Sequence, residues 1–318
     1  MNLSAPEISL VVVNWNSTAF LRGCLASVHR QCRRISLEII VVDSGSYDGC
    51  GDMLVAEFPE AKFLQLSENV GFGRANDIGV GQAHGEFVWF LNPDTELVCD
   101  AAAILREVFH LRPATGIAGA RLLNADRSIQ TTCVHPLPTP LNQALDSEFL
   151  RRRLGIWGVR AFNERAVPVK VEAVSGACMM LRRGDFLRAG GFGSRFFMYG
   201  EDMDLCFRIR GLGREILHVP TAEVIHYEGG SSRGQFKKFS VVMMRQSLDS
   251  YFKANHGLTQ AWLHRWLMAL SAVARIALLA ISSLFAGREN GSRSFRKWHA
   301  ILSWCFGLER WTKSFPPQ

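Results

Sequence analysis

Apolar runs and helix-like segments alternate along roughly the first 90 residues. The apolar runs are Ile8–Val13, Leu37–Val42, Ala61–Leu66 and Glu86–Leu91. Helical patterns fill the intervals at about residues 17–30, 48–58 and 72–84. Strands without polar alternation have both faces buried, as in a parallel sheet that helices cover on each side. The pattern therefore predicts an α/β fold with a mainly parallel central sheet.

Polar side chains follow these strands where each strand ends. Asn14 and Asn16 follow the first strand, Asp43 ends the second, and Asn92 and Asp94 flank a proline after the fourth. In such sheets the ligand site lies beyond the carboxyl ends of the strands. Asp43 could accept hydrogen bonds from a base or ribose there, or serve only in a turn. Asp94 could hold a hard cation that bridges a diphosphate, or cap the following helix.

The middle of the chain carries two further chemical signals. A helix is predicted at Glu201–Gly211, and three carboxylates, of Glu201, Asp202 and Asp204, crowd its first turn. Crowding raises at least one carboxyl pKa, as a general base requires. An acidic first turn favoured by the helix dipole is the simpler interpretation. His226, before a Gly-Gly-Ser segment, could bind a metal or phosphate, or be purely structural.

Around these signals the remaining elements are less regular. Residues 113–170 show a weak pattern, Val169–Leu181 predicts one strand with a bend at Ser175, and residues 215–219 and 223–226 predict two more strands. The eight cysteines show no zinc-ligand spacing and indicate buried thiols in a reducing cytosol. The first apolar run is too short for a signal peptide, and Glu7 precedes it.

The last quarter of the chain differs from the rest in charge and composition. Residues 236–318 hold 12 basic and three acidic residues, a net charge of +9, whereas the first 235 residues hold 24 and 26, a net charge of −2. Five of the eight tryptophans also lie in this tail. The whole chain has a net charge of +7, but the body charge of −2 disfavours a nucleic-acid binder. Trp, Lys and Arg together are typical of a membrane interface.

A long apolar segment at Trp262–Phe285 dominates this tail. His264, Ser271, Arg275 and Ser282 fall on one helical stripe within it. Spanning a bilayer would place Arg275 near its centre, at a cost of about 2.5–3.5 kcal/mol on insertion scales. The pattern therefore favours a helix that lies in a membrane interface. A soluble helical subdomain is the other interpretation of the same segment.

Several motifs, in order, resemble those of glycosyltransferase family 2. They are VVVNWN, VVDSGS, ENVGFGRAND, FLNPDTEL, GACMMLRRGDFLRAGGF, FFMYGEDMDLCFRIRGLG and HVPTAEVIHYEGGSS. The resemblance covers about residues 7–232 and is closest to the rhamnosyltransferase-like branch, which acts on lipid-linked or polysaccharide acceptors. It implies a nucleotide-sugar-binding fold of the GT-A type and transfer with inversion at the sugar carbon.

The resemblance assigns roles position by position. Asp202, beside Glu201, is taken as the catalytic base, and Asp94 with His226 as ligands of a divalent cation, Mg²⁺ or Mn²⁺. The donor-binding positions are Asn14, Asn16, Asp43, Asn69, Gly71, Arg74, Asn76 and Asn92. Asn92 stands where many relatives have an aspartate, so one charged cation ligand of the family pattern is missing. Weaker cation binding is the expected consequence.

These patterns predict a catalytic domain at residues 1–235 and a basic, helical, membrane-interfacial region at 236–318. The expected reaction moves L-rhamnose from deoxythymidine-diphosphate-rhamnose to a polyprenyl-diphosphate-linked or glycan acceptor, at the cytoplasmic face of the membrane in cell-envelope glycan synthesis. A uridine-diphosphate hexose is the alternative donor. A sugar nucleotidyltransferase would need a Gly-rich basic loop where NWNST stands. A membrane-tethered carbohydrate-binding protein without catalysis would not need the three acids at strand ends.

Overall fold

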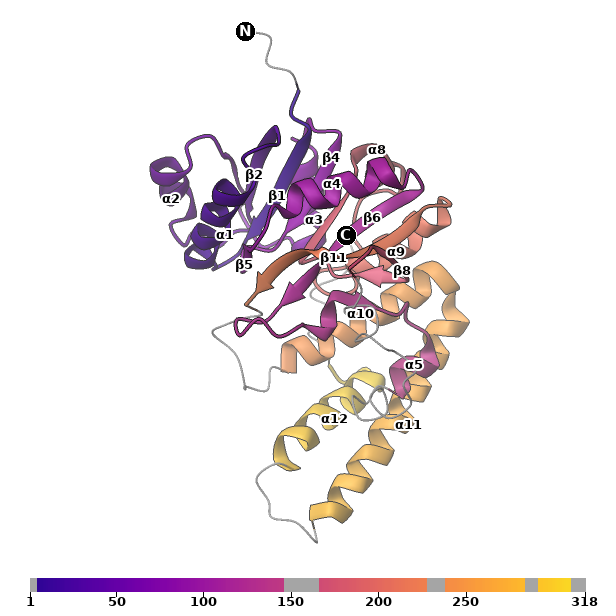
Figure 1. The fold of residues 1–318 in the computed structure, drawn as a ribbon. Coiled ribbons are helices and arrows are strands. Elements are labelled where there is room, and N and C mark those ends of the chain that lie inside the picture. The colour runs from indigo at the N-terminus through magenta and orange to yellow at the C-terminus, as the bar shows by residue number, and fades with distance from the viewer. Residues whose placement is uncertain (1–4, 146–165, 228–237, 284–290, 310–318) are drawn as a thin grey trace. The chain divides into compact units, whose positions relative to one another are not determined.

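The computed structural model describes residues 5–145, 166–227, 238–283 and 291–309 (Figure 1). The first half of the chain alternates strand and helix as its pattern predicts. Its elements are β1 (Ile8–Asn14), α1 (Thr18–Gln31), β2 (Leu37–Asp43), α2 (Cys50–Glu57), β3 (Lys62–Gln65), α3 (Phe72–Val80), β4 (Phe87–Leu91), β5 (Thr95–Leu97), α4 (Ala101–Leu111) and β6 (Thr115–Leu123). The four predicted strands and three predicted helices are all present, and α3 ends four residues earlier than predicted.

The second half contains shorter strands and longer helices. Its elements are a 3-10 turn (Thr131–Cys133), β7 (Val134–His135), α5 (Pro140–Ala144), β8 (Val169–Val171), β9 (Ala173–Val174), β10 (Cys178–Arg182), α8 (Arg183–Arg188), α9 (Glu201–Gly211), β11 (Glu215–His226), α10 (Lys238–His256), α11 (Leu258–Ser283) and α12 (Gly291–Cys305). The chain forms two compact units. The first holds all strands with α1–α4, α8 and α9, and the second holds α5, residues 194–200 and α10–α12.

The central sheet has the strand order β3-β2-β1-β4-β10-β6-β11-β5, and β8 pairs with β11. β3, β2, β1 and β4 are parallel, β10 inserts antiparallel between β4 and β6, and β11 is parallel to β6. Every residue of β1 and of β4 is buried, as the absence of polar alternation predicts. The prediction of a mainly parallel α/β sheet is therefore confirmed.

Three details of the middle region differ from the sequence prediction. Val169–Leu181 is three short strands, because the chain turns at Ser175–Ala177 before β10 begins. The two predicted strands at 215–219 and 223–226 form one strand, β11, with an irregular register between them. β6 lies inside the stretch predicted to be less regular. Its sequence TGIAGARLL is rich in small residues and gives a weak apolar pattern, although eight of its nine residues are buried.

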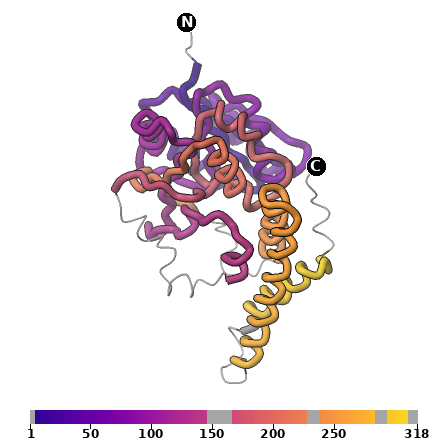
Figure 2. Tube along the Cα trace, turned by 90° about the vertical axis from the view of Figure 1, so that its right-hand side faces the viewer, coloured from indigo at the N-terminus to yellow at the C-terminus, as the bar shows by residue number. Residues whose placement is uncertain are grey.

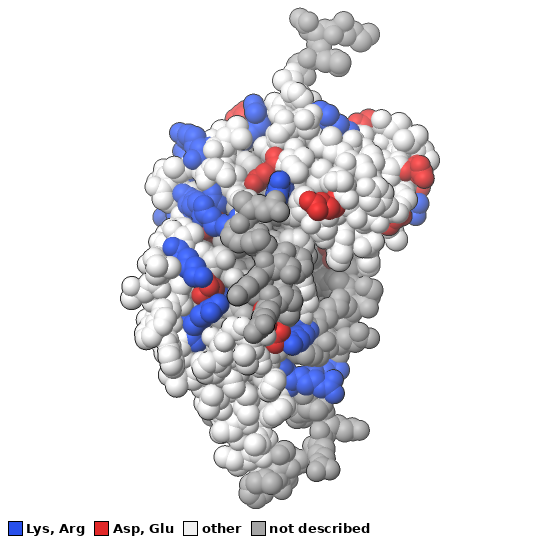
Figure 3. Space-filling model, turned by 180° about the vertical axis from the view of Figure 1, so that it is seen from behind, with Lys and Arg blue, Asp and Glu red and all other residues white. Residues whose placement is uncertain are grey.

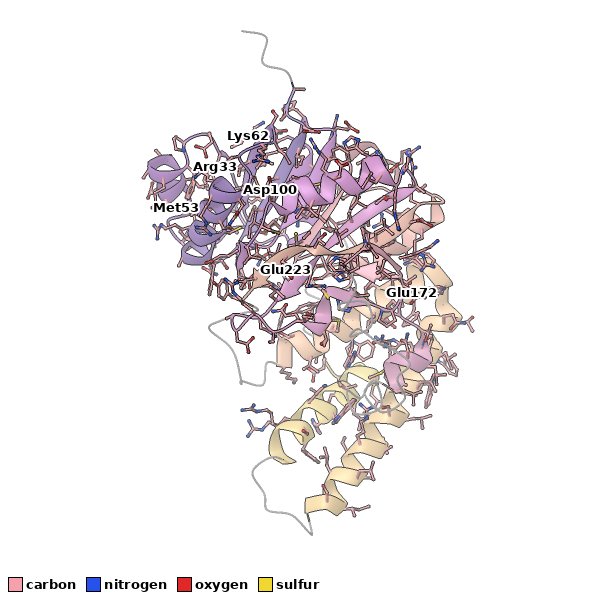
Figure 4. All side chains as sticks on the ribbon, in the orientation of Figure 1. Arg33, Met53, Lys62, Asp100, Glu172 and Glu223 are labelled. Carbon is pink, nitrogen blue, oxygen red and sulfur yellow. The ribbon has the colours of Figure 1, made fainter. Side chains whose placement is uncertain are left out.

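Helix α3 lies directly against β1 and β2. A Cβ added at Gly79 would lie 2.5 Å from a methyl carbon of Val11, so only glycine permits this approach. On α4, the side chain of Asp100, labelled in Figure 4, accepts a hydrogen bond from the Ala103 amide and caps the helix. The eight cysteines are free, and burial raises the pKa of Cys24, Cys178 and Cys206 to about 12, so these thiols stay protonated.

The second unit is built around α11, which packs against α5, α10 and α12 (Figures 1 and 2). Three residues of its polar stripe face these neighbours: His264 lies between Phe252 and Trp304, Ser271 donates to the Ala144 carbonyl, and Arg275 stacks 4.2 Å from the Trp298 ring centroid. The fourth, Ser282, is exposed and donates to the Leu279 carbonyl of α11 itself. Residues Leu258–Ser282 are long and apolar enough to cross a membrane by length and composition alone. The domain boundary predicted after residue 235 lies outside the described residues.

Candidate active site

Two parallel strands end side by side at the carboxyl edge of the sheet, where Asn14 of β1 pairs in register with Asp43 of β2. The Asn14 amide donates to Asp43 Oδ2 at 2.7 Å and to Asp48 Oδ1 at 3.0 Å. Asn14 Oδ1 is buried and has no hydrogen-bond partner among the described residues. The pair lies where ligands bind in open α/β sheets.

Asp43 is fully buried, and protein groups occupy its acceptor positions. Oδ1 accepts from the Ser46 amide and from Gln65, while Oδ2 accepts from Asn14 and the Ser46 hydroxyl. Burial raises the pKa of Asp43, but these hydrogen bonds outweigh it and lower the pKa overall. Asp43 therefore stays ionised and holds Asn14 in place. Contact of Asp43 with a nucleoside remains a prediction, and it requires one of these bonds to be exchanged.

The segment from Asn69 to Asn76 forms the entrance to α3. Asn69 Oδ1 accepts from the Gly71 amide at 2.9 Å and from Ser44 Oγ at 3.3 Å, which ties this segment to the loop after β2. Gly71 has a φ of +85°, a conformation that favours glycine. Asn76 is buried and donates to the Phe72 carbonyl of its own helix, whereas Arg74 is exposed.

Asn16, also predicted to bind the donor, is exposed and has a φ of +52°. The structure thus brings together Asn14, Asp43, Asn69 and Gly71 at the ends of β1 and β2. It joins them through Ser44 and Ser46, which the sequence prediction did not single out. Their donor-binding roles stay predictions.

Asp94 and His226 meet because β5 pairs with β11, which sets Thr95 opposite His226. His226 Nε2 lies 3.3 Å from Asp94 Oδ1 and 3.4 Å from Asn92 Nδ2. Glu223, labelled in Figure 4, lies on the same strand three residues earlier. The strand pairing brings together two residues that are more than 130 positions apart in the sequence.

Gln130 fixes the orientation and tautomer of His226. Its Nε2 donates to the His226 carbonyl at 2.6 Å, and its Oε1 lies 3.1 Å from His226 Nδ1. Because Nε2 of Gln130 faces a carbonyl, Oε1 must accept from the ring, so Nδ1 carries the proton. In the neutral form of this ring, the lone pair of Nε2 is on the side of Asp94. Sequence reasoning missed Gln130, since only the irregular loop after β6 brings it to β11.

This cluster fits a divalent cation. Two electron-pair donors, Asp94 Oδ1 and His226 Nε2, face each other, and the buried Oδ1 of Asn92 has no hydrogen-bond partner among the described residues. No group of three His, Cys, Asp or Glu that could hold a metal occurs in the described part of the chain. Amide oxygen, water and phosphate oxygens would complete the shell, as Mg²⁺ and Mn²⁺ accept.

The three carboxylates at the start of α9 have three different surroundings. Asp204 is buried and pairs with Arg208 at 2.8 Å, and Arg208 also donates to the Gly191 carbonyl. Asp77 accepts from the Phe192 and Gly193 amides, so the glycine-rich loop at 190–193 is held between α3 and α9. Asp204 therefore has a structural role.

Glu201 and Asp202 differ in burial and in hydrogen bonding. Burial, and secondly the charge of Asp202, raise the pKa of Glu201 to about 8, and Glu201 Oε2 has no hydrogen-bond partner among the described residues. Asp202 is half-buried, and its Oδ2 accepts from the Gly176 amide at 3.0 Å. At neutral pH Glu201 is thus protonated.

The raised pKa of Glu201 predicts a specific dependence of stability on pH. Between pH 4.5 and about 8 the folded state keeps a proton on Glu201 that the unfolded chain has lost, so rising pH destabilises the fold. We expect Glu201→Gln to remove this dependence. The difference between the unfolding free energies of the variant and the wild type should increase with pH in this window, by up to roughly 1.4 kcal/mol per pH unit. Urea unfolding at several pH values measures it, and parallel curves would contradict it.

The turn before β10 connects the two groups of acids. Asp202 accepts from the Gly176 amide, and the next residue, Ala177, accepts at its carbonyl from the Asn92 amide at 2.9 Å. A Cβ added at Gly176 would lie 3.4 Å from the Asp202 Cβ, so this turn and α9 are in close contact. One short backbone segment therefore links the half-buried carboxylate of Asp202 to the strand end that leads to the candidate cation site.

This sheet, with candidate ligand-binding residues beyond its carboxyl edge, is a fold of the GT-A glycosyltransferase type. The family model described as Glycosyl transferase family 2 matches residues 9–186, more than half of the chain. The chain belongs to that family and is a glycosyltransferase, as its motifs predict.

Named relatives place it in the rhamnosyltransferase-like branch. It is 27% identical over 300 residues to an N-acetylglucosaminyl-diphospho-decaprenol L-rhamnosyltransferase of Mycobacterium tuberculosis, covering 89% of this chain and 95% of the relative. It is 28% identical to rhamnosyltransferase WbbL of Escherichia coli over 53% of this chain and 65% of that one. A mannosyltransferase from Pyrobaculum calidifontis, solved with GDP-mannose and Mn²⁺, has a TM-score of 0.63 at 17% identity over 98% of this chain and 89% of that chain. That likeness concerns the fold.

Proposed function

We propose that the protein transfers L-rhamnose, with inversion, from deoxythymidine-diphosphate-rhamnose to a polyprenyl-diphosphate-linked acceptor in cell-envelope glycan synthesis. The turn at Gly176–Ala177 carries this proposal, because it joins the carboxylate of Asp202 to the Asn92–Asp94 segment. The mycobacterial relative, whose name includes a lipid-linked N-acetylglucosamine acceptor, supports the choice of sugar and acceptor.

In this mechanism Asp202 is the general base. Its carboxylate takes the proton from an acceptor hydroxyl while that oxygen attacks the anomeric carbon from the face opposite the diphosphate. The Gly176 amide orients Asp202, and Glu201 beside it is neutral. A cation held by Asp94 and His226 would neutralise the departing nucleoside diphosphate. Asn14 and Asn69 lie where the nucleoside would bind.

A donor panel tests the proposal. Purified protein with Mn²⁺ and a polyprenyl-diphosphate-N-acetylglucosamine acceptor is offered deoxythymidine-diphosphate-rhamnose, uridine-diphosphate-glucose, uridine-diphosphate-N-acetylglucosamine or guanosine-diphosphate-mannose. Mass spectrometry and anomeric NMR should identify a rhamnosylated product with inverted configuration. Transfer from a uridine-diphosphate sugar alone would replace the proposed donor, and retention would exclude the role of Asp202.

Gln130 allows a test of the cation site that does not touch a ligand. Gln130→Leu removes both hydrogen bonds to His226, so we expect Mn²⁺ affinity to fall by about 10–100-fold. Electron paramagnetic resonance titration of free Mn²⁺, with the nucleoside diphosphate present, measures this affinity. Gln82→Leu, at an exposed position of the same unit, is the matched control. Equal affinities in the two variants would show that Gln130 does not position the ligand.

A further inference from the structure

One face of α11 is apolar and exposed over most of the helix length. Its large exposed side chains define a surface that we call the α11 stripe: Trp262, Trp266, Leu270, Val273, Leu278 and Ile281. Exposed apolar side chains normally occur singly on a soluble protein, and a continuous set indicates an interaction surface. Above the grey atoms at the bottom of Figure 3, which belong to residues that are not described, the described surface is mainly white and therefore carries few charged groups on the side in view.

The polar groups of α11 are directed away from the stripe. His264 is fully buried and makes ring contacts with Phe252 and Trp304. Arg265 stacks 4.7 Å from the Trp304 ring centroid, and Arg275 stacks 4.2 Å from that of Trp298. The stripe therefore carries no charge, although arginines interrupt the apolar sequence of the helix.

The exposed charged side chains in the described parts of α10–α12 are all basic. The described acidic residues of α10–α12 and the turn after them are Asp249 and Glu309, and both are buried. Asp249 pairs with Lys253 at 2.8 Å and with Arg265 at 3.3 Å, while Glu309 pairs with Lys238. Basic side chains on these helices, among them Arg293 and Arg296, are exposed. This surface is complementary to an anionic one.

A hollow of about 560 Å³ lies at the amino-terminal end of the stripe. Lys253, Arg265, Thr259 and Trp262 line it, together with the buried carboxylate of Asp249. Two cationic side chains against one carboxylate leave an excess positive charge. A tryptophan beside cationic groups is the composition found at the headgroup level of membranes.

We propose that the α11 stripe lies in the interface of a bilayer of anionic phospholipids, with the helix axis parallel to the membrane and a phosphate headgroup in this hollow. The inference rests on the proposed action at a membrane surface and specifies how the protein meets it. If α11 spanned the bilayer, Arg265 and Arg275 would enter the hydrocarbon with it. Asp249 would follow, because it pairs with Arg265, and Trp298 packs on Arg275. A second copy of the chain would meet a surface of the same positive charge.

Vesicle binding tests the stripe. We expect the full chain to sediment with phosphatidylglycerol vesicles and much less with phosphatidylcholine vesicles. Leu270→Glu with Leu278→Glu, at side chains that are 62% and 65% exposed, should weaken binding by at least about tenfold without disturbing the fold. The matched control is Val55→Glu with Leu111→Glu, whose side chains are 78% and 72% exposed in the first unit. Equal loss in both double variants would overturn the proposal.

Lys253→Gln tests the hollow, since Arg265 still pairs with Asp249 in that variant. We expect it to lower the preference for phosphatidylglycerol over phosphatidylcholine, while inorganic phosphate at millimolar concentration does not displace the vesicles. Displacement by phosphate alone would mean that the hollow binds a free anion rather than a lipid. An unchanged lipid preference would remove the hollow from the proposal.

Depth measurements separate a helix that lies flat from one that spans. Leu270→Cys and Leu278→Cys, with Cys99→Ser and Cys305→Ser, each take a nitroxide label. The two positions are eight residues apart, about 12 Å along a helix axis. A helix parallel to the surface gives equal, shallow depths, whereas depths that differ by about 12 Å would show spanning. Light scattering without vesicles identifies a dimer, and a dimer that the stripe variants dissolve would overturn the proposal.

Activity measurements on the same variants test the catalytic proposal separately from membrane binding. Hydrolysis of deoxythymidine-diphosphate-rhamnose, or transfer to a water-soluble acceptor analogue, is measured without vesicles. We expect the stripe variants to keep this activity. A wild type that is inactive with this donor would reject the proposed donor. A wild type that is active but does not bind the vesicles would reject the proposed membrane surface.

Discussion

Asp202→Asn should lower the turnover number by about 10²–10⁴-fold, the range that a positioned general base contributes. The amide oxygen of asparagine can still accept the hydrogen bond that the Gly176 amide gives to Asp202, so the turn and α9 should keep their positions. Donor affinity should therefore change little. Steady-state kinetics with calorimetric donor binding separates these effects, since the loss falls on turnover and not on binding.

Glu201→Gln is the matched comparison for this experiment. Glu201 has a pKa raised to about 8 by burial first and by Asp202 second, so a neutral amide resembles its form at neutral pH. We expect a much smaller loss of turnover than for Asp202→Asn. If Glu201→Gln were the more damaging change, the roles of the two acids would be reversed. Near-normal turnover in Asp202→Asn would exclude it as the base.

Asp94→Ala should reduce kcat/KM at least about 100-fold, because it removes the carboxylate that faces His226 Nε2 at the candidate cation site. Both donor affinity and rate should fall, since the cation would bridge protein and diphosphate in ground and transition states. Activity against Mn²⁺ concentration measures the effect, and raised Mn²⁺ should restore part of it.

Asp52→Ala, at an exposed position on α2, controls for loss of a negative charge in the same unit. Full activity of Asp94→Ala in the presence of a chelator would contradict a cation role at this position. A loss that no Mn²⁺ concentration reduces, together with unchanged Mn²⁺ affinity, would indicate that Asp94 acts only through the pairing of β5 with β11.

Sequence reasoning recovered the carboxyl edge of the sheet because its signal is local. The runs in β1, β2 and β4 are buried on both faces, and the polar residue that ends each one follows it directly. Since parallel strands place their carboxyl ends together, Asn14, Asp43 and Asn92 could be assigned to one edge without knowledge of side-chain contacts. The family motifs then named the enzyme class, which the comparisons confirm.

Long-range pairing decided the parts that the sequence left open. Gln130 reaches His226 across 96 positions, and Asp94 reaches it through β5, a strand of three residues that gives no pattern of its own. The different surroundings of Glu201, Asp202 and Asp204 follow from the burial and partners of each: Glu201 is buried, Asp202 is half-buried, and Asp204 is buried and paired with Arg208. Three adjacent acids look alike in sequence, whereas Arg208 and the Gly176 amide distinguish them in space.

The C-terminal helices show the same division. The sequence by itself determined that Trp262–Phe285 is apolar, that a polar stripe runs along it, and that its surroundings are basic. Only the tertiary structure decided which side of α11 is exposed. Helices α5, α10 and α12 cover the side with His264, Ser271 and Arg275, and the apolar side stays exposed. The reason is physical, since helical periodicity sets which residues share a face, while packing against neighbouring helices sets which face is buried.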